Sequence, residues 1–367
     1  MIKVLIVDDS AIVRKVLTEE LSKHPDIEVV GSAVDPYVAR DKILQLDPDV
    51  LTLDIEMPRM DGLTFLYHLM RQYPLPVVVL SSLTPRNSEM ALRALRLGAV
   101  EVIPKPDSRY SVPDGRFLAE VIRAAARAKV GRPRGAEEDS DGEKSARAAE
   151  EVAREAVAEL GTLTTTHRVI ALGASTGGTT TLEEILRQFP PIAPGTVIVQ
   201  HMPENFTRLF AERLDSVCKV RVREAVDLDP VVPGTVLVAP GGRHMTLERS
   251  GAQYRVRLKD GPRVHFQKPS VDVLFFSVAK AAGHNAVGAL LTGMGADGAK
   301  GLLAMKEAGA HTIAQNEATC VVYGMPREAV RLGAASEILP LDRIAGALLK
   351  AAARPREKQS EVVEAKP

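Results

Sequence analysis

The chain of 367 residues has no tryptophan, only two cysteines and no excess of charge of either sign. Cys218 and Cys320 are too few to form a disulfide framework, which indicates a reducing compartment. Lysine plus arginine total 47, as do aspartate plus glutamate, so the formal net charge is zero. Because nucleic-acid binders usually carry a basic surplus, we do not expect nucleic acid as a partner.

Long hydrophobic runs are also absent. No stretch of about 18 uncharged apolar residues occurs, and the N-terminus, MIKVLIVDDS, lacks the apolar core of a signal peptide. We therefore expect a cytoplasmic protein without membrane insertion. Apolar residues make up 45% of the chain and charged residues 26%, which is a globular balance. At roughly 150 residues per domain, the length predicts two domains.

The chain divides into two regions of alternating strand and helix signals, residues 1–125 and residues 167–350. Such alternation predicts the α/β class, with parallel sheets covered by helices on both faces. In the first region the expected strands are Lys3–Val7, Glu28–Ala33, Val50–Leu53, Val77–Leu80 and Val100–Ile103, with helices such as Ala11–Ser22 and Gly62–Arg71. In the second the expected strands are Arg168–Leu172, Val197–Val199, Val236–Val238, Ala286–Leu291 and Thr312–Ala314.

Residues 126–166, between these regions, have the composition of a linker. A basic, turn-prone stretch, RAKVGRPRG, is followed by the acidic AEEDSDGEK, which has no large apolar residue. Within the linker, residues 144–160 form a possible amphipathic helix, either a solvated spacer or a segment that docks on a domain. Residues 351–367 are expected to be a disordered tail.

Carboxylates follow two strands of the first predicted sheet. Asp8 and Asp9 come after the first strand and Asp54 after the third, at the edge where ligands bind in open parallel sheets. Three carboxylates that meet there would repel one another unless a hard cation such as Mg²⁺ lay between them. Ser81 closes the fourth strand and Lys105 follows the fifth. A hydroxyl and an ammonium group at the same edge suit a phosphoryl group.

This set resembles the receiver domain of two-component response regulators over residues 1–125, which implies a flavodoxin-like fold with a five-stranded parallel sheet. The resemblance implies that Asp54 accepts a phosphoryl group from a histidine kinase. It also implies a Mg²⁺ site formed by Asp8, Asp9, Asp54 and the Glu56 carbonyl, with Ser81 and Lys105 as switch residues. Val102 stands where many receivers carry an aromatic switch residue, so a switch by aromatic rotation is not expected.

A serine lies in a sharp strand-to-helix turn of the second region. The segment Gly173–Gly177, GASTG, follows the strand RVIAL and precedes the helical pattern TTLEEILRQF. This is the G-x-S-x-G pattern of a nucleophile elbow, which exposes the serine hydroxyl at the sheet edge. The start of the following helix favours a developing oxyanion. Ser175 is therefore a candidate nucleophile, although serine is also a common helix cap.

A serine nucleophile needs a general base and an acid that orients the base. His201 closes the strand VIVQ at the same edge, and His244, after the strand VLVAP, is the rival base. Asp297, in LLTGMGADG, is the candidate acid because it also follows an apolar strand. Asp272 and Asp260 are alternatives that do not follow one.

The segment around Asp297 also matches a second motif. Gly293, Gly295 and Gly298 form a G-x-G-x-x-G pattern after a strand, with Glu317 about twenty residues further on, as in dinucleotide-binding folds. However, too little chain follows Glu317 to complete paired nucleotide-binding halves. We therefore do not expect a dinucleotide.

Several segments of the second region, GASTGGT, VQHMPENFTRLFAERLD, APGGRHM, KPSVDVLFFSVA, TGMGADGAKGLLAMKEAGA and AQNEATCVVYGMPREA, resemble the chemotaxis protein-glutamate methylesterase (CheB) family. The resemblance implies a doubly wound α/β methylesterase domain. It also implies that Ser175 is the nucleophile, His201 the general base and Asp297 the acid, with the amides of Thr176 and Met294 as oxyanion donors. The order Ser–His–Asp differs from that of α/β-hydrolases.

The family resemblance implies a phosphorylation-activated serine hydrolase of chemotaxis adaptation. Its substrates would be methyl-accepting chemoreceptors, on which it would hydrolyse glutamate γ-methyl esters and deamidate selected glutamines. The esterase site would need no metal or cofactor, and the only ion would be Mg²⁺ at the receiver. The unphosphorylated receiver would cover the esterase cleft.

Two other function classes are compatible with a receiver domain. A DNA-binding output domain would need a basic recognition helix, which the balanced charge argues against. A catalytically silent docking module would result if Ser175 only capped a helix.

Overall fold

The computed structural model describes residues 1–57, 60–82, 84–105, 115–131 and 168–353. The possible linker helix over residues 144–160 lies outside the described residues. The predicted start of the tail at residue 351 was wrong, because the last described helix runs to Ala353 and its final three alanines are buried. The rest of the predicted tail lies outside the described residues. None of the helices in the described part of the chain combines the length and hydropathy of a membrane span.

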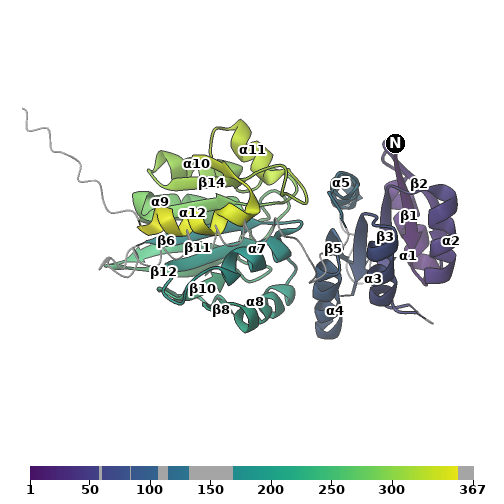
Figure 1. Ribbon diagram of the computed structural model, residues 1–367, viewed down its shortest axis with the longest axis horizontal. Helices are drawn as coiled ribbons and strands as arrows, with labels where there is room; N and C mark the ends of the chain where they lie inside the picture. Colours follow the sequence, from purple (N-terminus) through teal and green to yellow (C-terminus); the bar gives the residue numbers. More distant parts are fainter. Residues whose placement is uncertain (58–59, 83, 106–114, 132–167, 354–367) are drawn as a thin grey trace, which may run out of the picture.

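The N-terminal domain is built on a five-stranded parallel sheet in the order β2-β1-β3-β4-β5 (Figure 1). The strands are β1 (Ile2–Val7), β2 (Ile27–Ala33), β3 (Val50–Asp54), β4 (Val77–Ser81) and β5 (Glu101–Pro104). The helices are α1 (Ala11–Leu21), α2 (Pro36–Leu46), α3 (Gly62–Gln72), α4 (Pro85–Arg96) and α5 (Gly115–Ala126). The five strands and the two helices predicted here are confirmed to within two residues at each end.

The continuous apolar runs predicted this arrangement because strands of a parallel sheet are buried on both faces. All residues of β3 and β4 are buried, and alternate side chains enter different cores. Helices α1 and α5 cover one face, and α2, α3 and α4 cover the other. The receiver fold implied by the sequence is therefore confirmed.

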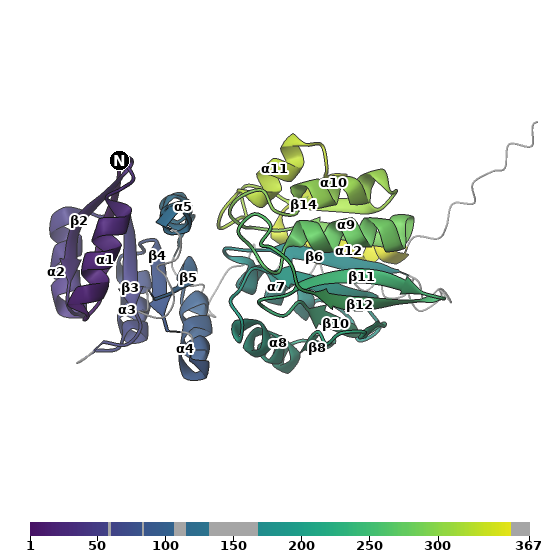
Figure 2. The ribbon, with the colours of Figure 1, turned by 180° about the vertical axis from the view of Figure 1, so that it is seen from behind.

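The C-terminal domain has a seven-stranded parallel sheet in the order β15-β14-β13-β6-β7-β10-β8 (Figure 2). Its strands are β6 (Val169–Ala174), β7 (Gly195–Gln200), β8 (Arg221–Glu224), β10 (Thr235–Val238), β13 (Ala286–Leu290), β14 (His311–Gln315) and β15 (Glu337–Leu339). Its helices are α7 (Gly178–Arg187), α8 (Phe206–Val217), α9 (Val271–Ala282), α10 (Ala299–Glu307), α11 (Met325–Arg331) and α12 (Leu341–Ala353). Helices α7, α8 and α12 cover one face of the sheet, and α9, α10 and α11 cover the other.

An antiparallel sheet beside the parallel one was not expected from the sequence. It consists of β11 (His244–Ser250), β12 (Gln253–Lys259) and the short β9 (Pro230–Val231). The paired segments HMTLERS and QYRVRLK alternate apolar with charged residues, because one face is solvated. Their charge content hid them from a search for buried apolar runs, and the edge strands β8 and β15 were missed for the same reason.

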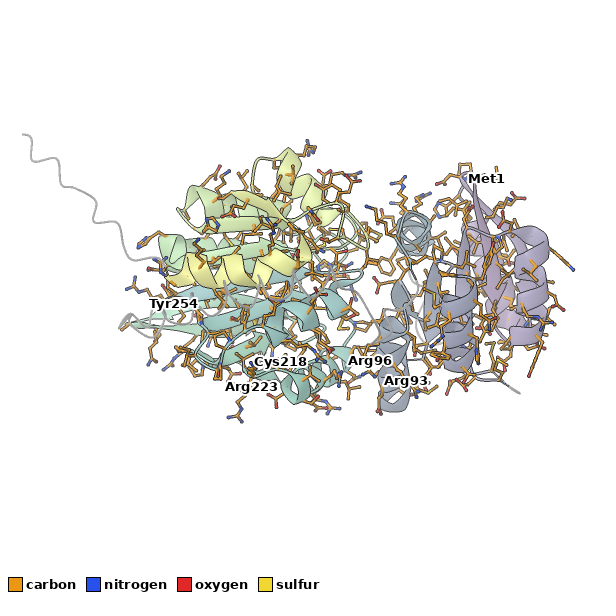
Figure 3. All side chains as sticks on the ribbon, in the orientation of Figure 1. Met1, Arg93, Arg96, Cys218, Arg223 and Tyr254 are labelled. Atoms are coloured by element: carbon orange, nitrogen blue, oxygen red, sulfur yellow. The ribbon has the colours of Figure 1, made fainter. Side chains whose placement is uncertain are left out.

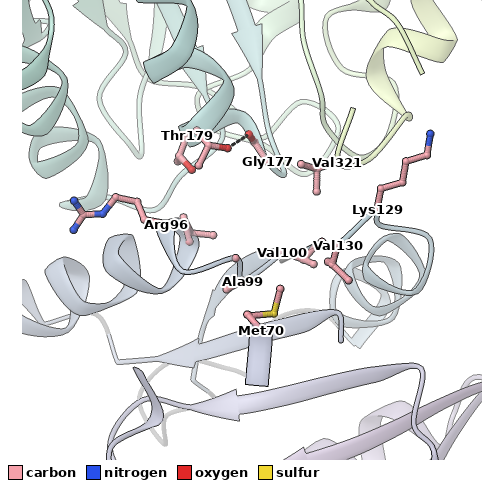
Figure 4. Close-up of a pocket in the computed structure, with 13 residues that line it drawn as sticks. Met70, Arg96, Ala99, Val100, Lys129, Val130, Gly177, Thr179 and Val321 are labelled. Atoms are coloured by element: carbon pink, nitrogen blue, oxygen red, sulfur yellow. Dashed lines mark hydrogen bonds between the residues drawn. The ribbon is translucent and has the colours of Figure 1, made fainter. Parts of the chain in front are cut away.

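The receiver lies against the esterase domain along β5 and α4, with α4 contacting α7 and α8 (Figures 1 and 2). Figure 3 shows Arg96 of α4 at this boundary. A cavity of about 150 Å³ lies between the domains, with Val100 and Arg96 on one side and Thr179 and Val321 on the other (Figure 4). Beside this cavity, the amide of Lys129 donates to the Val321 carbonyl at 3.1 Å, which fixes the start of the linker on the esterase domain.

Candidate active site

Ser175 lies in the turn between β6 and α7, where backbone contacts hold it at the sheet edge. Its amide donates to the Thr292 carbonyl at 3.0 Å, and its carbonyl accepts from Nε2 of Gln200 at 2.9 Å. The turn depends on Gly177, which has a φ of +78° and lies so close to Val321 that a Cβ would stand 2.6 Å from it. The turn is thus fixed by contacts on three sides.

His201 directly follows β7, the strand that pairs with β6, and its amide donates to the Ala174 carbonyl at 3.1 Å. The serine and the histidine therefore lie at neighbouring strand ends. Nε2 of His201 is 2.8 Å from Oδ2 of Asp297. Nδ1 is buried and has no hydrogen-bond partner among the described residues. In this orientation Nε2–H donates to the aspartate, and Nδ1 is the nitrogen that can take a proton.

Asp297 follows β13, on the other side of β6, and is held by the start of α9. Its Oδ1 accepts from the Ser270 hydroxyl at 2.8 Å and the Asp272 amide at 3.0 Å, and its Oδ2 accepts from the Val271 amide at 2.8 Å. Although burial favours the neutral acid, His201 and these amides hold the pKa of Asp297 below its ordinary value. The carboxylate is therefore charged and fixed.

Sequence reasoning missed Ser270, which caps α9 and orients Asp297. Its hydroxyl accepts from the Val273 amide at 3.3 Å in addition to the bond to Asp297. The segment PSVDVLFF, a serine directly before an apolar helical run, is a recognisable N-cap signal. That signal predicts the helix start, but it cannot show that the cap also contacts a residue 27 positions away.

His244, the rival base, uses both ring nitrogens in structural hydrogen bonds. Nε2 lies 2.9 Å from the Pro262 carbonyl, and Nδ1 accepts from the Ser270 amide at 3.2 Å. It therefore ties the segment after β12 to the start of α9. With both nitrogens engaged, His244 offers no free nitrogen to a serine, which favours His201 as the base.

The alternative acids also have other partners. Asp260 is paired with Lys268 at the surface. Asp272 accepts from the Gly301 amide at 2.7 Å and lies 3.2 Å from Nε2 of His265. His265, Asp272 and Asp297 are close enough to share a cation. However, both Asp297 oxygens already accept two hydrogen bonds each, so this cluster is poorly suited to metal binding.

The loop after β13 lies directly against Ser175. A Cβ on Gly293 would stand 2.7 Å from the Ser175 Cβ and 2.3 Å from Sδ of Met325. The amides of Thr176 and Met294 make no hydrogen bond to any described residue. Gly293 of the G-x-G-x-x-G pattern therefore serves close packing at the serine, and two unused amides, one in the serine turn and one in the loop after β13, are candidates for oxyanion donors.

Gly293→Ala is expected to lower both the melting temperature and the esterase turnover, because the new methyl group displaces Ser175 or Met325. Gly295→Ala is the matched control, since Gly295 has a φ of +84° but no atom within 4 Å of an added Cβ. It should cost only about 1 kcal/mol of backbone strain. Thermal unfolding and methanol release measure the two effects. Equal losses in both variants would contradict the packing argument.

The receiver forms part of the wall of the cavity beside the triad. This cavity, of about 170 Å³, is lined by Phe117 and Glu120 of α5, the segments 265–267 and 294–297, and His201. Sequence reasoning missed the loop residues His265 and Phe266, which carried no motif. Phe266 is half exposed at the cavity. The receiver thus contributes two residues to the wall of this cavity, while its covering of the site in the resting state stays a prediction.

The receiver brings its predicted acids together at the carboxyl end of the sheet. Nζ of Lys105 lies 2.6 Å from Oδ2 of Asp54 and 3.3 Å from Oδ2 of Asp8. Burial raises the pKa of Asp54 to about 6, because the single ammonium is shared between two buried carboxyls and does not compensate the lost solvation. Burial likewise raises the pKa of Asp8.

The same cluster fits a divalent cation. Oxygens of Asp8, Asp9 and Asp54 lie within 4.8 Å of one another, and the buried Oδ2 atoms of Asp8 and Asp54 have Lys105 as their ionic partner but no hydrogen bond within the described chain. The Glu56 amide donates to Oδ1 of Asp54 at 3.0 Å. Coordination through the Glu56 carbonyl stays a prediction.

The two switch positions of the receiver, Ser81 and Val102, lie in different surroundings. The Ser81 hydroxyl donates to the backbone carbonyls of Ser82 at 3.2 Å and Asn87 at 3.3 Å, so it is engaged with the first turn of α4 as well as with its own loop. Val102 is 8% exposed and belongs to the core. Because valine has no aromatic ring, a switch by ring rotation cannot occur at this position.

Comparison with known proteins agrees with both domains. A family model described as CheB methylesterase matches residues 170–348, and one described as response regulator receiver domain matches residues 4–112. The chain is 59% identical over 350 residues to protein-glutamate methylesterase/protein-glutamine glutaminase 2 of Syntrophus aciditrophicus, which covers 95% of this chain and 98% of the relative.

A second relative is the protein-glutamate methylesterase/protein-glutamine glutaminase of Salmonella typhimurium, at 50% identity over 353 residues, 95% of this chain and 96% of the relative. The crystal structure of the Thermotoga maritima CheB methylesterase catalytic domain is 35% identical, with a TM-score of 0.49, and covers 50% of this chain and 98% of that chain. The identity and coverage of the full-length relatives, together with the receiver and the serine turn, show that the chain belongs to the CheB family of receiver-linked protein-glutamate methylesterases.

Proposed function

We propose that this protein hydrolyses glutamate γ-methyl esters on methyl-accepting chemoreceptors, deamidates selected receptor glutamines, and is activated by phosphorylation of Asp54. One observation carries the proposal: Ser175, His201 and Asp297 follow three adjacent strands, and the histidine is already hydrogen-bonded to the aspartate. The names of the full-length relatives supply the two activities, and the family resemblance of the sequence supplies the chemoreceptors as substrates.

In the proposed reaction the Ser175 hydroxyl attacks the ester carbonyl while Nδ1 of His201 takes its proton. Asp297 stabilises the imidazolium that forms. The amides of Thr176 and Met294 donate to the oxyanion of the tetrahedral intermediate. His201 then returns the proton to the departing methoxide, which leaves as methanol, and an acyl-enzyme remains. Water, deprotonated by the same imidazole, hydrolyses the acyl-enzyme and regenerates Ser175.

At the receiver, Asp8, Asp9 and Asp54 would hold Mg²⁺, which when bound neutralises charge on the incoming phosphoryl group. The Asp54 carboxylate is the proposed nucleophile towards a phosphohistidine of the kinase. Lys105 already pairs with Asp54 and Asp8 in this structure, so it is placed to pair with the phosphoryl oxygens once Asp54 is modified.

Activation requires that the modified and unmodified receivers differ in how well they cover the site, because a modification shifts an equilibrium only by its differential effect. Phe117 and Glu120 of the receiver stand in the cavity wall with His201. Their side chains take up part of the space beside His201 that a receptor segment would need. We therefore infer that phosphorylation favours a state in which the receiver has moved from the cavity.

The function is tested by methanol release from membranes that carry methylated receptors, using the full chain with Mg²⁺ and a small-molecule phosphodonor. The proposal expects methanol in proportion to the methyl groups lost, and no methanol from unmethylated membranes. Mass spectrometry of receptor peptides would show glutamine converted to glutamate at selected sites. A protein that becomes phosphorylated but releases neither methanol nor ammonia would be the docking module considered above.

Asp54→Asn is expected to abolish the stimulation by phosphodonor and to leave the basal turnover within about twofold of wild type, since Asp54 belongs to the receiver and not to the proposed triad. The asparagine cannot accept a phosphoryl group but keeps a similar shape beside Lys105. The matched control is Asp41→Asn, an exposed acid on α2 of the same domain. Stimulation that survived in Asp54→Asn would move the phosphorylation site elsewhere.

A further inference from the structure

A carboxyl group of the receiver lies against the residue that follows the candidate nucleophile. The Thr176 hydroxyl donates a hydrogen bond to Oε2 of Glu101, with 2.5 Å between the oxygens. Glu101 opens β5, the edge strand of the receiver sheet, and its Oε1 accepts from the Val102 amide at 3.1 Å. Thr176 is only 4% exposed. The two domains are therefore joined by a part-buried side-chain contact at the nucleophile turn itself.

The surroundings of this carboxyl group are unusual for a structural contact. Burial raises the pKa of Glu101, and the Thr176 hydroxyl, the Val102 amide and the positive charge that His201 can carry only partly oppose this shift. No lysine or arginine forms an ion pair with Glu101 among the described residues. A carboxylate placed here loses solvation and receives two hydrogen bonds from neutral donors, the Thr176 hydroxyl and the Val102 amide, so the contact between the domains is weak.

The Thr176 hydroxyl also has no role within the turn. The carbonyl of Thr176 accepts from the Thr292 hydroxyl at 3.0 Å, which fixes the backbone. Within the described chain, its own hydroxyl bonds only to Glu101. When the receiver moves away, this hydroxyl loses Glu101 and is left free to bond another acceptor.

The chemistry of Glu101 matches that of the substrate. The proposed reaction converts a glutamate γ-methyl ester into a glutamate γ-carboxylate, and Glu101 presents a glutamate side chain to the residue after the nucleophile. A hydroxyl that binds one glutamate carboxyl group can bind another through the same oxygen acceptor.

Resting on the proposed function, we propose that the Thr176 hydroxyl binds the γ-carboxyl group of the target glutamate, as ester and as product. In the resting enzyme Glu101 occupies that position as an internal product analogue. The receiver then excludes substrate in two ways: Glu101 competes for the Thr176 hydroxyl, and the receiver blocks the site sterically. Thr176 is a positioning residue, acting through its side chain separately from the oxyanion role given to its amide.

The position of Glu101 along β5 links this contact to the phosphorylation site. The strand runs only from Glu101 to Pro104, and Lys105 follows at once with its ion pair to Asp54. A change in the partners of Lys105 therefore acts on the same short strand that carries Glu101. A weak contact suits this arrangement, because little energy is then needed to separate Glu101 from Thr176.

The first experiment tests Thr176 in the activated enzyme, in which the receiver no longer competes. Thr176→Val keeps the amide and the branched shape but lacks the hydroxyl. With Mg²⁺ and phosphodonor present, KM for methylated receptor should rise by about 3- to 10-fold while kcat changes by less than about twofold, the pattern of lost ground-state binding. Thr176→Ser, which restores the hydroxyl, should return KM to the wild-type value.

The matched control is Thr180→Val in the first turns of α7, whose exposed hydroxyl bonds only the Gly177 carbonyl among the described residues. It should leave KM unchanged. Inhibition by a demethylated receptor peptide, which carries the product carboxylate, should weaken in Thr176→Val by the same factor as KM. An unchanged KM together with unchanged product inhibition would overturn the role of Thr176.

The second experiment tests Glu101 in the resting enzyme, without phosphodonor. Glu101→Ala should raise kcat/KM by about 3- to 10-fold in a Thr176 background, corresponding to one modest hydrogen bond, and should give no rise in a Thr176→Val background. Glu89→Ala, an exposed acid on α4 of the same domain, should have no effect. An equal rise in both backgrounds would mean that Glu101 acts by bulk alone, which would overturn competition for the hydroxyl.

If Thr176→Val does not fold, binding of the product peptide to Glu101→Ala still tests the proposal. In the resting state the product peptide should bind Glu101→Ala about 3- to 10-fold more tightly than wild type, whereas after phosphorylation the two should bind equally. Equal binding in the resting state would overturn the proposal. Failure of the proposed function is distinct, because wild-type protein would then release no methanol even when phosphorylated.

Discussion

Ser175→Ala is expected to lower the rate of methanol release by a factor of about 10⁵ to 10⁶, as loss of the nucleophile does in other serine hydrolases. Alanine removes only the hydroxyl oxygen, while the backbone bonds of residue 175 to Thr292 and Gln200 remain. The melting temperature should therefore change by no more than about 2 °C, and phosphorylation of Asp54 should proceed as in wild type.

The control for this variant is Ser216→Ala, which removes an exposed hydroxyl of α8 that bonds the Arg213 carbonyl. It should retain the wild-type rate. A fluorophosphonate reagent should label wild type and Ser216→Ala once the receiver is phosphorylated, but not Ser175→Ala. Methanol release by Ser175→Ala at the rate of wild type would exclude Ser175 as the nucleophile.

His201→Ala is expected to lower kcat by a factor of about 10⁴ or more, because it removes the proposed general base. Nδ1 of His201 is unpaired while Nε2 is held by Asp297, so the imidazole is oriented before substrate binds. Removing the imidazole also leaves Oδ2 of Asp297 without the hydrogen bond to Nε2. Rates of methanol release, measured with saturating methylated receptor, test the loss.

His244→Ala is the comparison that separates a catalytic histidine from a structural one. It removes the bonds to the Pro262 carbonyl and the Ser270 amide, so it should cost about 1 to 3 kcal/mol of stability while kcat stays within about tenfold of wild type. A variant of His244 that folds normally but loses turnover more severely than His201→Ala would reverse the assignment of the base.

Much of the fold was predictable because both domains are parallel sheets. Their strands are buried on both faces and appear as unbroken apolar runs, as in VLTLD of β3 and VVVLS of β4. The antiparallel pair β11 and β12 escaped prediction because charged residues alternate along it on the solvated side. A search for continuous hydrophobic runs cannot find strands of that kind.

The candidate site residues were predictable for a related reason. In a parallel sheet every strand ends at the same edge, so residues that directly follow different strands meet there whatever their separation in the sequence. Ser175 follows β6, His201 follows β7 and Asp297 comes shortly after β13, three neighbouring strands. The motif predicted the serine, and the family resemblance chose His201 and Asp297 among the alternatives.

The sequence by itself determined the two α/β domains, the acids and lysine of the receiver, and the serine turn of the esterase. Only the tertiary structure decided which imidazole nitrogen faces Asp297, that Ser270 caps both a helix and the acid, and that Glu101 bonds Thr176. These contacts join segments that no periodicity links, since each depends on how separately formed elements pack together. Sequence pattern reports the face that a residue occupies, whereas its partner on another element is set by the assembled fold.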